Sequence, residues 1–331
     1  MSHGIKKVAL LFAGGPAPAA NAVISTCAIS CINNGIDVIG IRHGYSRLID
    51  YSPDQALVEG EAYLELHEVM LRRTRSKQGI LIGTARANPG KYVTSPADLD
   101  DDEKCDPLRR VYEGLRSLEV DALVSIGGDD TLKTANKLKM YQDRLPEGNP
   151  RVPVVHVPKT IDNDYTGIDF TFGYFTAVET LGTEISNLHA DAEASSAYFV
   201  VESMGRSAGW LAYGAAISGE ANMVLSVEDI VGNLRSPEST DDRIVMDINA
   251  VVMKIVRMMR FRQEKQRKDY GVVVVAEGLA EFLSDEALAD VPRDDHGHIS
   301  VAHVDLGKMF ARRVAAEYTK QTGSTRKVTG L

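Results

Sequence analysis

Short apolar runs alternate with segments of helical periodicity along most of this chain. Apolar runs bounded by polar or glycine-rich turns are typical of buried strands. The predicted strands are Lys6–Phe12, Gly35–Ile41, Ala122–Ile126, Val152–Val157, Ser196–Val201, Met223–Val227 and Gly271–Ala276. Helical spacing is found in Ala22–Ile32, Cys105–Leu118, Phe175–Ala190, Trp210–Ile217 and Asp247–Lys268, and Ile299–Tyr318 combines a short strand-like piece with a helix. This alternation predicts an α/β fold with mostly parallel sheets flanked by helices.

The chain length bounds the number of domains. With 331 residues, the chain exceeds the roughly 250–300 residues at which a single hydrophobic core stops growing. We therefore expect two Rossmann-like α/β/α domains, comprising residues 1–174 and 175–331.

The polar residues of most interest follow two neighbouring predicted strands, Ala122–Ile126 and Val152–Val157. Chemistry in an open α/β sheet collects at the carboxyl ends of its strands. The two strand ends supply Asp129, Asp130, Thr131, Lys159, Thr160, Asp162 and Asp164. So many carboxylates suit a divalent metal or a proton acceptor. An Asp-rich turn would explain one aspartate, but it explains two adjacent loops poorly.

Each loop indicates a chemical role. In the segment GGDDT, Asp129 is suited to hold Mg²⁺, and Thr131 begins a helix whose N–H groups face an anion. In the segment PKTIDND, an extended backbone would point residues 160, 162 and 164 to one side. One of these carboxylates would then accept the proton of an attacking hydroxyl, and Lys159 would stabilise the transferred group.

Composition and charge disfavour several other functions. The net charge of −9 disfavours nucleic acid as the main ligand, because such binding needs a basic surface. The three cysteines, Cys27, Cys31 and Cys105, form no disulfide framework and fit a reducing cytoplasm. There is no signal peptide and no apolar run of transmembrane length, so we expect a cytoplasmic protein without a membrane partner. His156, within a predicted strand, is more typical of a core residue than of a base.

The motifs together resemble the phosphofructokinase family over essentially the whole chain. The matching positions are Gly14-Gly15 with Asn21, Gly83–Arg86, GGDDT at 127–131, PKTIDND at 158–164, ESMGRSAG at 202–209 and AEG at 276–278. The combination of PKTIDND, the GGDDT loop and the MGR segment is highly specific. The resemblance implies a phosphofructokinase-like fold and transfer of a phosphoryl group to the 1-hydroxyl of fructose 6-phosphate.

The resemblance also implies roles for individual residues. Asp162 would take the hydroxyl proton, with Thr160 and Asp164 close by and Arg206 on the transferring phosphoryl group or the substrate. The sugar contacts would be Thr160, Asp162, Asp164, Met204, Gly205, Arg206 and Glu277. The phosphate donor would contact Gly15, Tyr45, Arg86, Gly128, Asp130 and Thr131, with Mg²⁺ near Asp129.

Two residues favour pyrophosphate over ATP as the donor. The ATP-type pattern has glycine at the positions of Asp130 and Lys159, and this chain is similar to the pyrophosphate-dependent branch at both. A carboxylate at position 130 would repel the α-phosphate of a nucleotide. Pro16 also matches that branch. The implied reaction is reversible and would serve glycolysis or gluconeogenesis.

Several features leave alternatives open. Ala197 replaces an arginine that reaches a neighbouring subunit's sugar-phosphate site in bacterial ATP-type enzymes. The Tyr and Arg that hold the 6-phosphate in the pyrophosphate-type pattern follow the position of Leu331, so the second domain is expected to be C-terminally incomplete.

The family's shared sites predict a homodimer or homotetramer. An ATP-dependent 6-phosphofructokinase and a non-catalytic subunit of the same fold are the alternatives, whereas the missing GxGxxG disfavours a dinucleotide-binding oxidoreductase.

Overall fold

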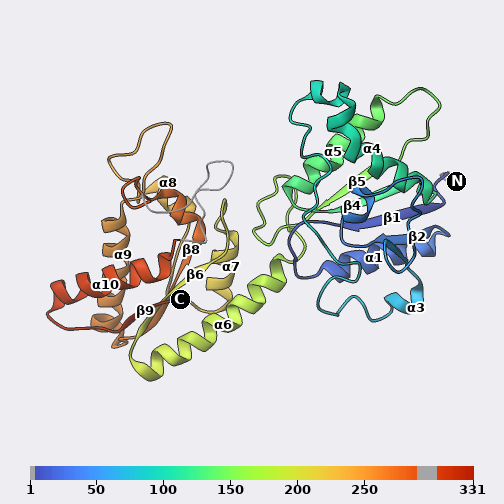
Figure 1. Ribbon diagram of the computed structural model, residues 1–331. Helices are drawn as coiled ribbons and strands as arrows, with labels where there is room; N and C mark the ends of the chain where they lie inside the picture. The colour runs from blue at the N-terminus through green and yellow to red at the C-terminus, as the bar shows by residue number, and fades with distance from the viewer. Residues whose placement is uncertain (1–3, 289–303) are drawn as a thin grey trace. The chain divides into compact units, whose positions relative to one another are not determined.

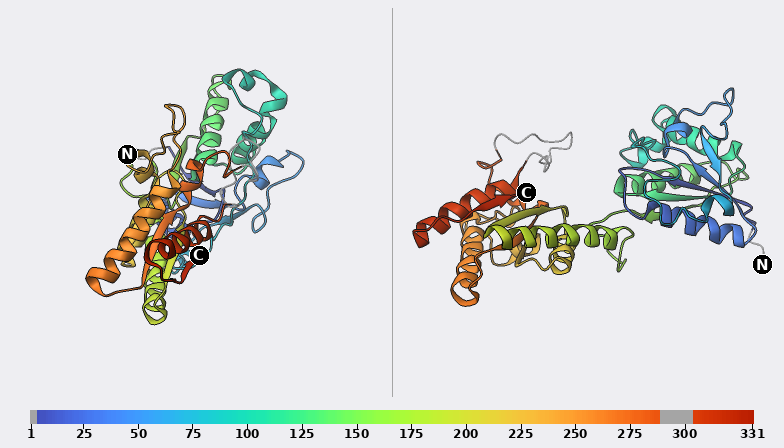
Figure 2. Two further views of the ribbon diagram at one scale, coloured as in Figure 1. Left: turned by 90° about the vertical axis from the view of Figure 1, so that its left-hand side faces the viewer. Right: turned by 90° about the horizontal axis from the view of Figure 1, so that it is seen from below.

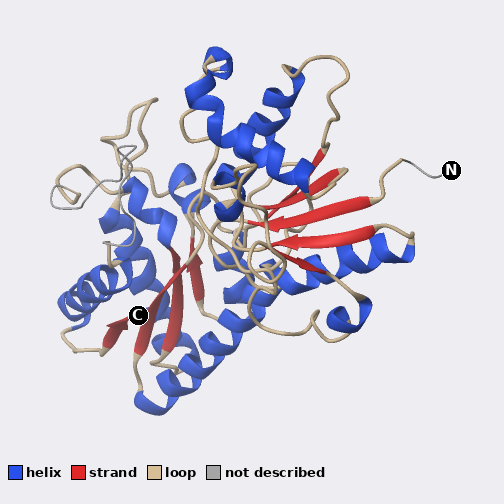
Figure 3. Ribbon diagram, turned by 45° about the vertical axis from the view of Figure 1, so that its right-hand side comes forward, coloured by secondary structure: helices blue, strands red, loops and turns tan. Residues whose placement is uncertain are grey.

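The computed structural model describes residues 4–288 and 304–331 (Figure 1). The chain divides into two compact units, the first comprising Met1–Thr160 and Thr171–Gly173 and the second comprising Ile161–Phe170 and Tyr174–Leu331. The segment Ile161–Phe170 thus groups with the second unit, although it precedes the expected boundary at residue 174. Each unit consists of one sheet with helices on both faces, as the alternation of apolar runs and helices predicts (Figure 3).

The sheet of the first unit has the strand order β3-β2-β1-β4-β5. Its strands are β1 (Lys7–Phe12), β2 (Asp37–Ile41), β3 (Tyr63–Glu65), β4 (Ala122–Gly127) and β5 (Val154–Pro158). All neighbours pair in parallel except β2 and β3. The carboxyl ends of β1, β4 and β5 therefore meet at one edge of this sheet, as the sequence pattern predicts.

Strand alternation gives the first unit two apolar layers. On one face, Leu11 and Leu123 pack with the helices α4 (Asp102–Ser117) and α5 (Asp129–Asp143). On the other face, Leu10 and Ile126 pack with α1 (Ala20–Asn33) and α3 (Glu68–Leu71). The remaining short elements are α2 (Ser46–Ile49) and the 3₁₀ turn Pro96–Asp100. Burial of both sheet faces explains why β1 reads as one continuous apolar run.

The sheet of the second unit has the order β7-β8-β6-β9 and is parallel throughout. Its strands are β6 (Tyr198–Ser203), β7 (Met223–Leu225), β8 (Gly271–Ala276) and β9 (Val328–Gly330). β8 is buried along its whole length, as expected for the central run GVVVVA. The carboxyl ends of β6 and β8 lead into the segments ESMGRSAG and AEG.

Helices cover both faces of the second sheet (Figure 2). One face packs against α9 (Ile248–Phe261) and α10 (Leu306–Thr322) through Val200 and Val275. The opposite face packs against α6 (Tyr174–Ser195) and α7 (Trp210–Ser218) through Phe199 and Val274. The other elements are α8 (Val227–Gly232), a π-helical turn at Arg262–Gln266 and the 3₁₀ helix η3 (Glu277–Phe282).

The structure corrects several local expectations. The short strands β3 and β9 were not expected, and the helix expected over Asp247–Lys268 is α-helical only from Ile248 to Phe261. β5 lies at an edge of its sheet and is not fully buried, because Val155 is 62% exposed. Within Ile299–Tyr318, the helix begins at Leu306, and residues 299–303, part of the segment expected to include a strand-like piece, lie outside the described residues.

Candidate active site

The glycine turn after β1 lies against the loop that contains Arg86. Gly14 adopts a left-handed φ of 90°, and its N–H donates to the carbonyl oxygen of Ala85 at 2.9 Å. The Thr84 hydroxyl donates to the Gly14 carbonyl oxygen at 2.7 Å. A side chain at Gly15 would meet nothing within 4 Å, so the space above this turn is open. The two hydrogen-bonded loops form one rim, with open space at Gly15.

The second part of this rim is the N-terminus of α5. Gly128 is its N-cap residue, and Asp129 and Asp130 occupy the first helical turn. Thr131 is buried, whereas the carboxylate of Asp130 is 87% exposed and lies 3.8 Å from the Lys133 ammonium. Unpaired N–H groups and the helix dipole make such a terminus attractive to anions. The exposed carboxylate of Asp130 opposes that attraction.

Lys159 connects the end of β5 to this rim. Its backbone N–H donates to the Gly127 carbonyl oxygen at 2.8 Å. A Cβ placed on Gly14 would lie 3.8 Å from Lys159 Cε and 4.0 Å from Thr131 Oγ1. Three sequence-distant segments of the first unit therefore converge beside Gly14, where the left-handed backbone conformation favours glycine. A cation, a helix N-terminus and a glycine turn are a suitable set for binding phosphate.

Of the two residues expected near the donor, Tyr45 is buried and Arg86 is exposed. Tyr45 is only 1% exposed, and its hydroxyl lies 3.4 Å from Ser125 Oγ. Burial raises the pKa of this phenol to about 12. Arg86 is exposed and makes no hydrogen bond or ion pair within residues 4–288 and 304–331. Arg86 is thus accessible to a ligand, while the Tyr45 side chain belongs to the hydrophobic core.

The PKTIDND segment crosses from the first unit to the second between Thr160 and Ile161. Lys159 and Thr160 belong to the first unit, and Asp162 and Asp164 belong to the second. The expected extended conformation is not observed, because the backbone bends at residues 161 and 162 and Asn163 has a left-handed φ of 56°. The simple strand alternation expected for residues 160, 162 and 164 therefore does not apply.

Hydrogen bonds hold this bent segment in place. The Asn163 side-chain amide donates to the Asp169 carbonyl oxygen at 3.2 Å. The Thr171 hydroxyl donates to the Thr160 carbonyl oxygen at 2.8 Å, where the chain has returned to the first unit. Asparagine is among the few non-glycine residues that adopt this backbone region readily. Asn163 thus supports the turn between Asp162 and Asp164, a role that the sequence pattern did not reveal.

In the second unit, two hydrogen bonds hold the MGR segment and the AEG segment together. Gly205, with a φ of 123°, donates its N–H to Glu277 Oε1 at 3.1 Å. Gly278 donates its N–H to the Gly205 carbonyl oxygen at 3.2 Å. These contacts bring the segments that carry Met204, Gly205 and Glu277 together at the carboxyl ends of β6 and β8. The Met204 side chain is 55% exposed.

Arg206 forms an ion pair with Glu281. Both side chains are partly exposed, at 43% and 39%. Exposed pairs of this kind contribute about 0–1 kcal/mol, so an incoming phosphate can replace the carboxylate. Glu281 is a residue that sequence reasoning missed, because it lies 75 positions from its partner.

Two further ionisable groups lie beside these segments. Half-buried His156 lies 3.1 Å through Nε2 from the Gly127 carbonyl oxygen, and burial lowers its pKa. Because a carbonyl only accepts, Nε2 carries the proton, and the buried Nδ1 has no partner among the described residues. Burial raises the pKa of Glu202, whose carboxylate accepts from the Gly307 N–H at 3.3 Å. His156 is thus a half-buried residue, as expected, but only its Nε2 has a hydrogen-bond partner among the described residues.

The donor set around Asp129 limits how a metal could be bound. In the described parts of the chain, no group of three or more His, Cys, Asp or Glu side chains could hold a metal ion. Mg²⁺ often binds through one or two carboxylates while phosphates and water complete its shell. Asp129 fits that arrangement but not an all-protein site. Burial and the neighbouring Cys31 thiol raise the pKa of Cys27 to about 11, so this thiol is protonated at neutral pH.

The comparison with known proteins agrees with these motifs. A family model for phosphofructokinase matches residues 7–330. The chain belongs to the phosphofructokinase family. The resemblance stated from its motifs is confirmed, and so is the two-unit α/β fold.

Named relatives of the chain extend the comparison. It is 35% identical over 315 residues to the pyrophosphate–fructose 6-phosphate 1-phosphotransferase of Naegleria fowleri, covering 92% of this chain and 64% of the relative. It is 31% identical to the enzyme of the same name from Thermotoga maritima, covering 96% and 68%. The chain thus spans less than two thirds of the Naegleria protein's length. An ATP-dependent 6-phosphofructokinase from Spirochaeta thermophila is 32% identical over 81% of this chain and 63% of its own length.

Solved structures support the phosphofructokinase fold. Phosphofructokinase from Saccharomyces cerevisiae superposes with a TM-score of 0.66 at 24% identity, covering 98% of this chain and 37% of that one. A pyrophosphate-dependent phosphofructokinase from Marinobacter aquaeolei gives a TM-score of 0.61 at 17% identity, covering 98% and 68%. None of the helices in residues 4–288 and 304–331 has both the length and the apolar composition needed to cross a bilayer.

Proposed function

We propose that this chain carries the active-site segments of a pyrophosphate-dependent 6-phosphofructokinase. The reaction would transfer a phosphoryl group from pyrophosphate to the 1-hydroxyl of fructose 6-phosphate, giving fructose 1,6-bisphosphate and phosphate. The observation that carries this proposal is the convergence of Gly14, Thr131 and Lys159 in the first unit, beside an exposed Asp130. The names of the relatives from Naegleria and Thermotoga support the same donor.

The donor would bind to the loops of the first unit. Gly15 and Gly128 would present backbone N–H groups, and Thr131 would add a hydroxyl. Arg86 and Lys159 would balance the charge of the pyrophosphate, since phosphate contacts are strongest when the donor is ionised. With its carboxylate exposed in the first turn of α5, Asp130 would repel a longer polyphosphate chain. Tyr45 would support the loops from the core, because its side chain is buried.

The acceptor would bind to the loops of the second unit. Asp164, Met204, Gly205 and Glu277 would surround the sugar, and Arg206 would leave Glu281 to contact a phosphoryl group. Asp162 would take the proton of the 1-hydroxyl as its oxygen forms the new P–O bond. The bridging P–O bond of pyrophosphate breaks, and its electron pair leaves on phosphate. Thr160 would orient the attacking hydroxyl.

Asp129 would hold Mg²⁺ together with the pyrophosphate oxygens and water. When bound, the ion neutralises charge on the phosphates during transfer. We further propose a cytoplasmic homodimer or homotetramer that acts in glycolysis or gluconeogenesis, with no nucleic-acid or membrane partner.

Aldolase-coupled assays with pyrophosphate and with ATP test the donor assignment. We expect turnover with pyrophosphate and at least about fivefold less with ATP, because one added repulsive charge at close range costs on the order of 1 kcal/mol or more. Asp130→Gly and Lys159→Gly together should shift the preference towards ATP. Asp143→Gly, at the opposite end of α5, is the matched control and should not. Turnover with ATP alone would refute the assignment and favour the ATP-dependent alternative.

A further inference from the structure

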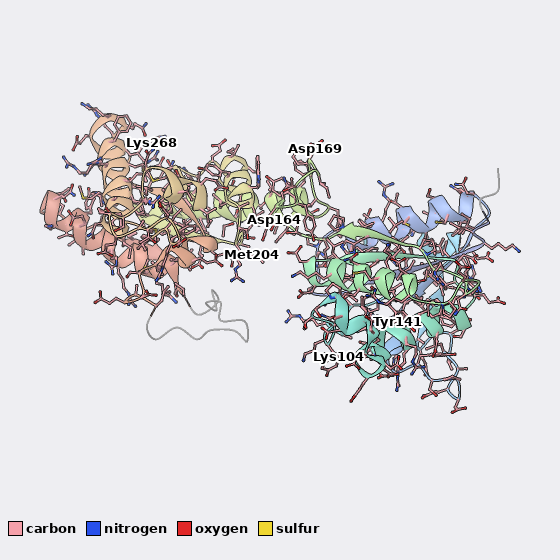
Figure 4. All side chains as sticks on the ribbon, turned by 90° about the horizontal axis from the view of Figure 1, so that it is seen from above. Lys104, Tyr141, Asp164, Asp169, Met204 and Lys268 are labelled. Atoms are coloured by element: carbon pink, nitrogen blue, oxygen red, sulfur yellow. The ribbon has the colours of Figure 1, made fainter. Side chains whose placement is uncertain are left out.

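An open cavity of about 750 Å³ lies within the second unit. One wall is part of the segment Ile161–Phe170, and the other is formed by Ser207, Ala208 and Trp210 at the start of α7. Its volume falls in the range of roughly 300–1,000 Å³ that is usual for small-molecule sites. Asp164, which we propose to contact the acceptor, is one of its lining residues, and Figure 4 shows Asp164 and Met204 at the same end of the unit.

Trp210 presents a large apolar surface to this cavity. The residue is 57% exposed and is the only tryptophan in the sequence. Its backbone is fixed, because the Tyr174 hydroxyl donates to the Trp210 carbonyl oxygen at 3.1 Å. The preceding Gly209 donates its N–H to Glu228 Oε1 at 3.0 Å. A rigidly placed and exposed indole in a cavity wall is a typical ligand contact.

A second aromatic side chain in the cavity wall is held just as firmly. Phe170 is 60% exposed and stacks on Tyr174 with ring centroids 6.2 Å apart and planes 14° apart. It also contacts Phe175, with centroids 4.8 Å apart. The Asn163 amide bond to the Asp169 backbone ties this wall to the turn that carries Asp162 and Asp164.

The charges of the cavity indicate which part of a ligand fits it. Asp164 and Asp169 line it, and none of its described lining residues is Lys, Arg or His. Carboxylates accept hydrogen bonds from hydroxyl groups but repel phosphate. Aromatic surfaces cover the C–H faces of a sugar. Arg206 immediately precedes the wall residue Ser207, so a cation is available next to the cavity for a phosphoryl group.

We propose that Trp210 is a further acceptor-binding residue, whose indole packs against a C–H face of the fructose moiety while the carboxylates of Asp164 and Asp169 accept its hydroxyls. This inference rests on the proposed function, which supplies the identity of the acceptor. It assigns the cavity to the sugar and excludes pyrophosphate from it.

Tryptophan fluorescence of the full chain, excited beyond the absorption band of tyrosine, reports on this site alone, because Trp210 is the sole tryptophan. Titration with fructose 6-phosphate should quench the emission or shift it to the blue with saturation, and titration with pyrophosphate alone should not. An emission that stays unchanged while calorimetry shows fructose 6-phosphate to be bound would overturn the inference. So would an equal response to pyrophosphate.

Steady-state kinetics provide the second test. Trp210→Ala should raise KM for fructose 6-phosphate about three- to tenfold, as expected for one aromatic contact, with kcat changed less than about twofold. Trp210→Phe keeps a ring and should lie close to wild type. Phe261→Ala removes an equally exposed aromatic at the end of α9, outside the cavity, and should leave KM unchanged. A wild-type KM in Trp210→Ala would contradict the proposal.

The two proposals fail in different ways. If no donor supports turnover but fructose 6-phosphate still changes the emission, the proposed reaction is wrong and the sugar contact stands. If turnover proceeds while the emission and the KM of Trp210→Ala stay at wild-type values, the proposed reaction stands and the contact is wrong.

Discussion

Gly278→Ala is the sharpest steric perturbation of the candidate site. Gly278 lies where the AEG segment crosses the MGR segment, and its N–H bonds to the Gly205 carbonyl oxygen. An added Cβ would overlap the Arg206 carbonyl oxygen and lie 2.9 Å from both the Arg206 carbonyl carbon and Val227 Cγ1. Two of these atoms are backbone, so a side-chain rotation cannot relieve the overlap.

The size of the effect follows from these distances. Non-bonded carbon atoms prefer about 3.5 Å or more, so the contact with the carbonyl carbon alone requires the Arg206 backbone to move by roughly 0.6 Å, and the closer contact with the carbonyl oxygen requires more. Such overpacking costs about 1–3 kcal/mol, which corresponds to a fall in Tm of about 2–12 °C for a unit of this size. Displacement of Arg206 should also lower kcat/KM for fructose 6-phosphate about ten- to a hundredfold.

Differential scanning calorimetry and coupled kinetics measure the two effects. Gly232→Ala is the matched control, because a Cβ at that glycine would meet nothing within 4 Å. The control should retain the wild-type Tm and kcat/KM. If Gly278→Ala also retained both, the close approach of the two segments would not be required, and the reasoning would fail.

Three other perturbations have defined outcomes. Glu281→Gln removes the ion pair of Arg206 and should tighten fructose 6-phosphate binding about two- to fivefold, the range that the loss of one exposed ion pair allows. Calorimetry measures this affinity, and weaker binding would show that Glu281 supports the site instead. The pKa of His156 is lower in the folded protein than the value of about 6.5 in the unfolded chain. Its contribution to the free energy of unfolding is therefore complete above pH 6.5 and is lost as the pH falls through the pKa of the folded state. Urea unfolding of His156→Gln between pH 5 and 8 should therefore show a smaller acid loss than wild type, and an identical loss would refute this linkage. Asn21→Ala leaves the Leu81 N–H and the Lys77 carbonyl unpaired and should lower the free energy of unfolding by about 2–4 kcal/mol, whereas a loss below about 0.5 kcal/mol in urea unfolding would contradict this expectation.

The strands that the sequence predicted well are those buried on both faces. β8 is an uninterrupted run of apolar residues, and its observed bounds match the expected ones. β3 and β9 have only three residues each, which is too short for periodicity to show. The exposed Val155 was misjudged because a run of apolar letters does not indicate that a strand lies at an edge.

Within the candidate site, the motifs identified the loops but not their conformation. The turn at Asn163 depends on its bond to Asp169 and on the return of the chain at Thr171, contacts that strand alternation cannot anticipate. The pairing of Arg206 with Glu281 arises from the parallel neighbours β6 and β8 bringing their loops together. Burial of Tyr45 likewise follows from packing between the sheet and α4, not from its local sequence.

The role of Asp162 is the centre of the proposed mechanism, and one rate measures it. Fructose 1,6-bisphosphate formation should be compared for wild type and Asp162→Asn at saturating fructose 6-phosphate and pyrophosphate, after thermal unfolding has shown both to be equally folded. Loss of the proton acceptor should lower kcat about 10²–10⁴-fold while KM changes little. Undiminished kcat in Asp162→Asn would contradict the account.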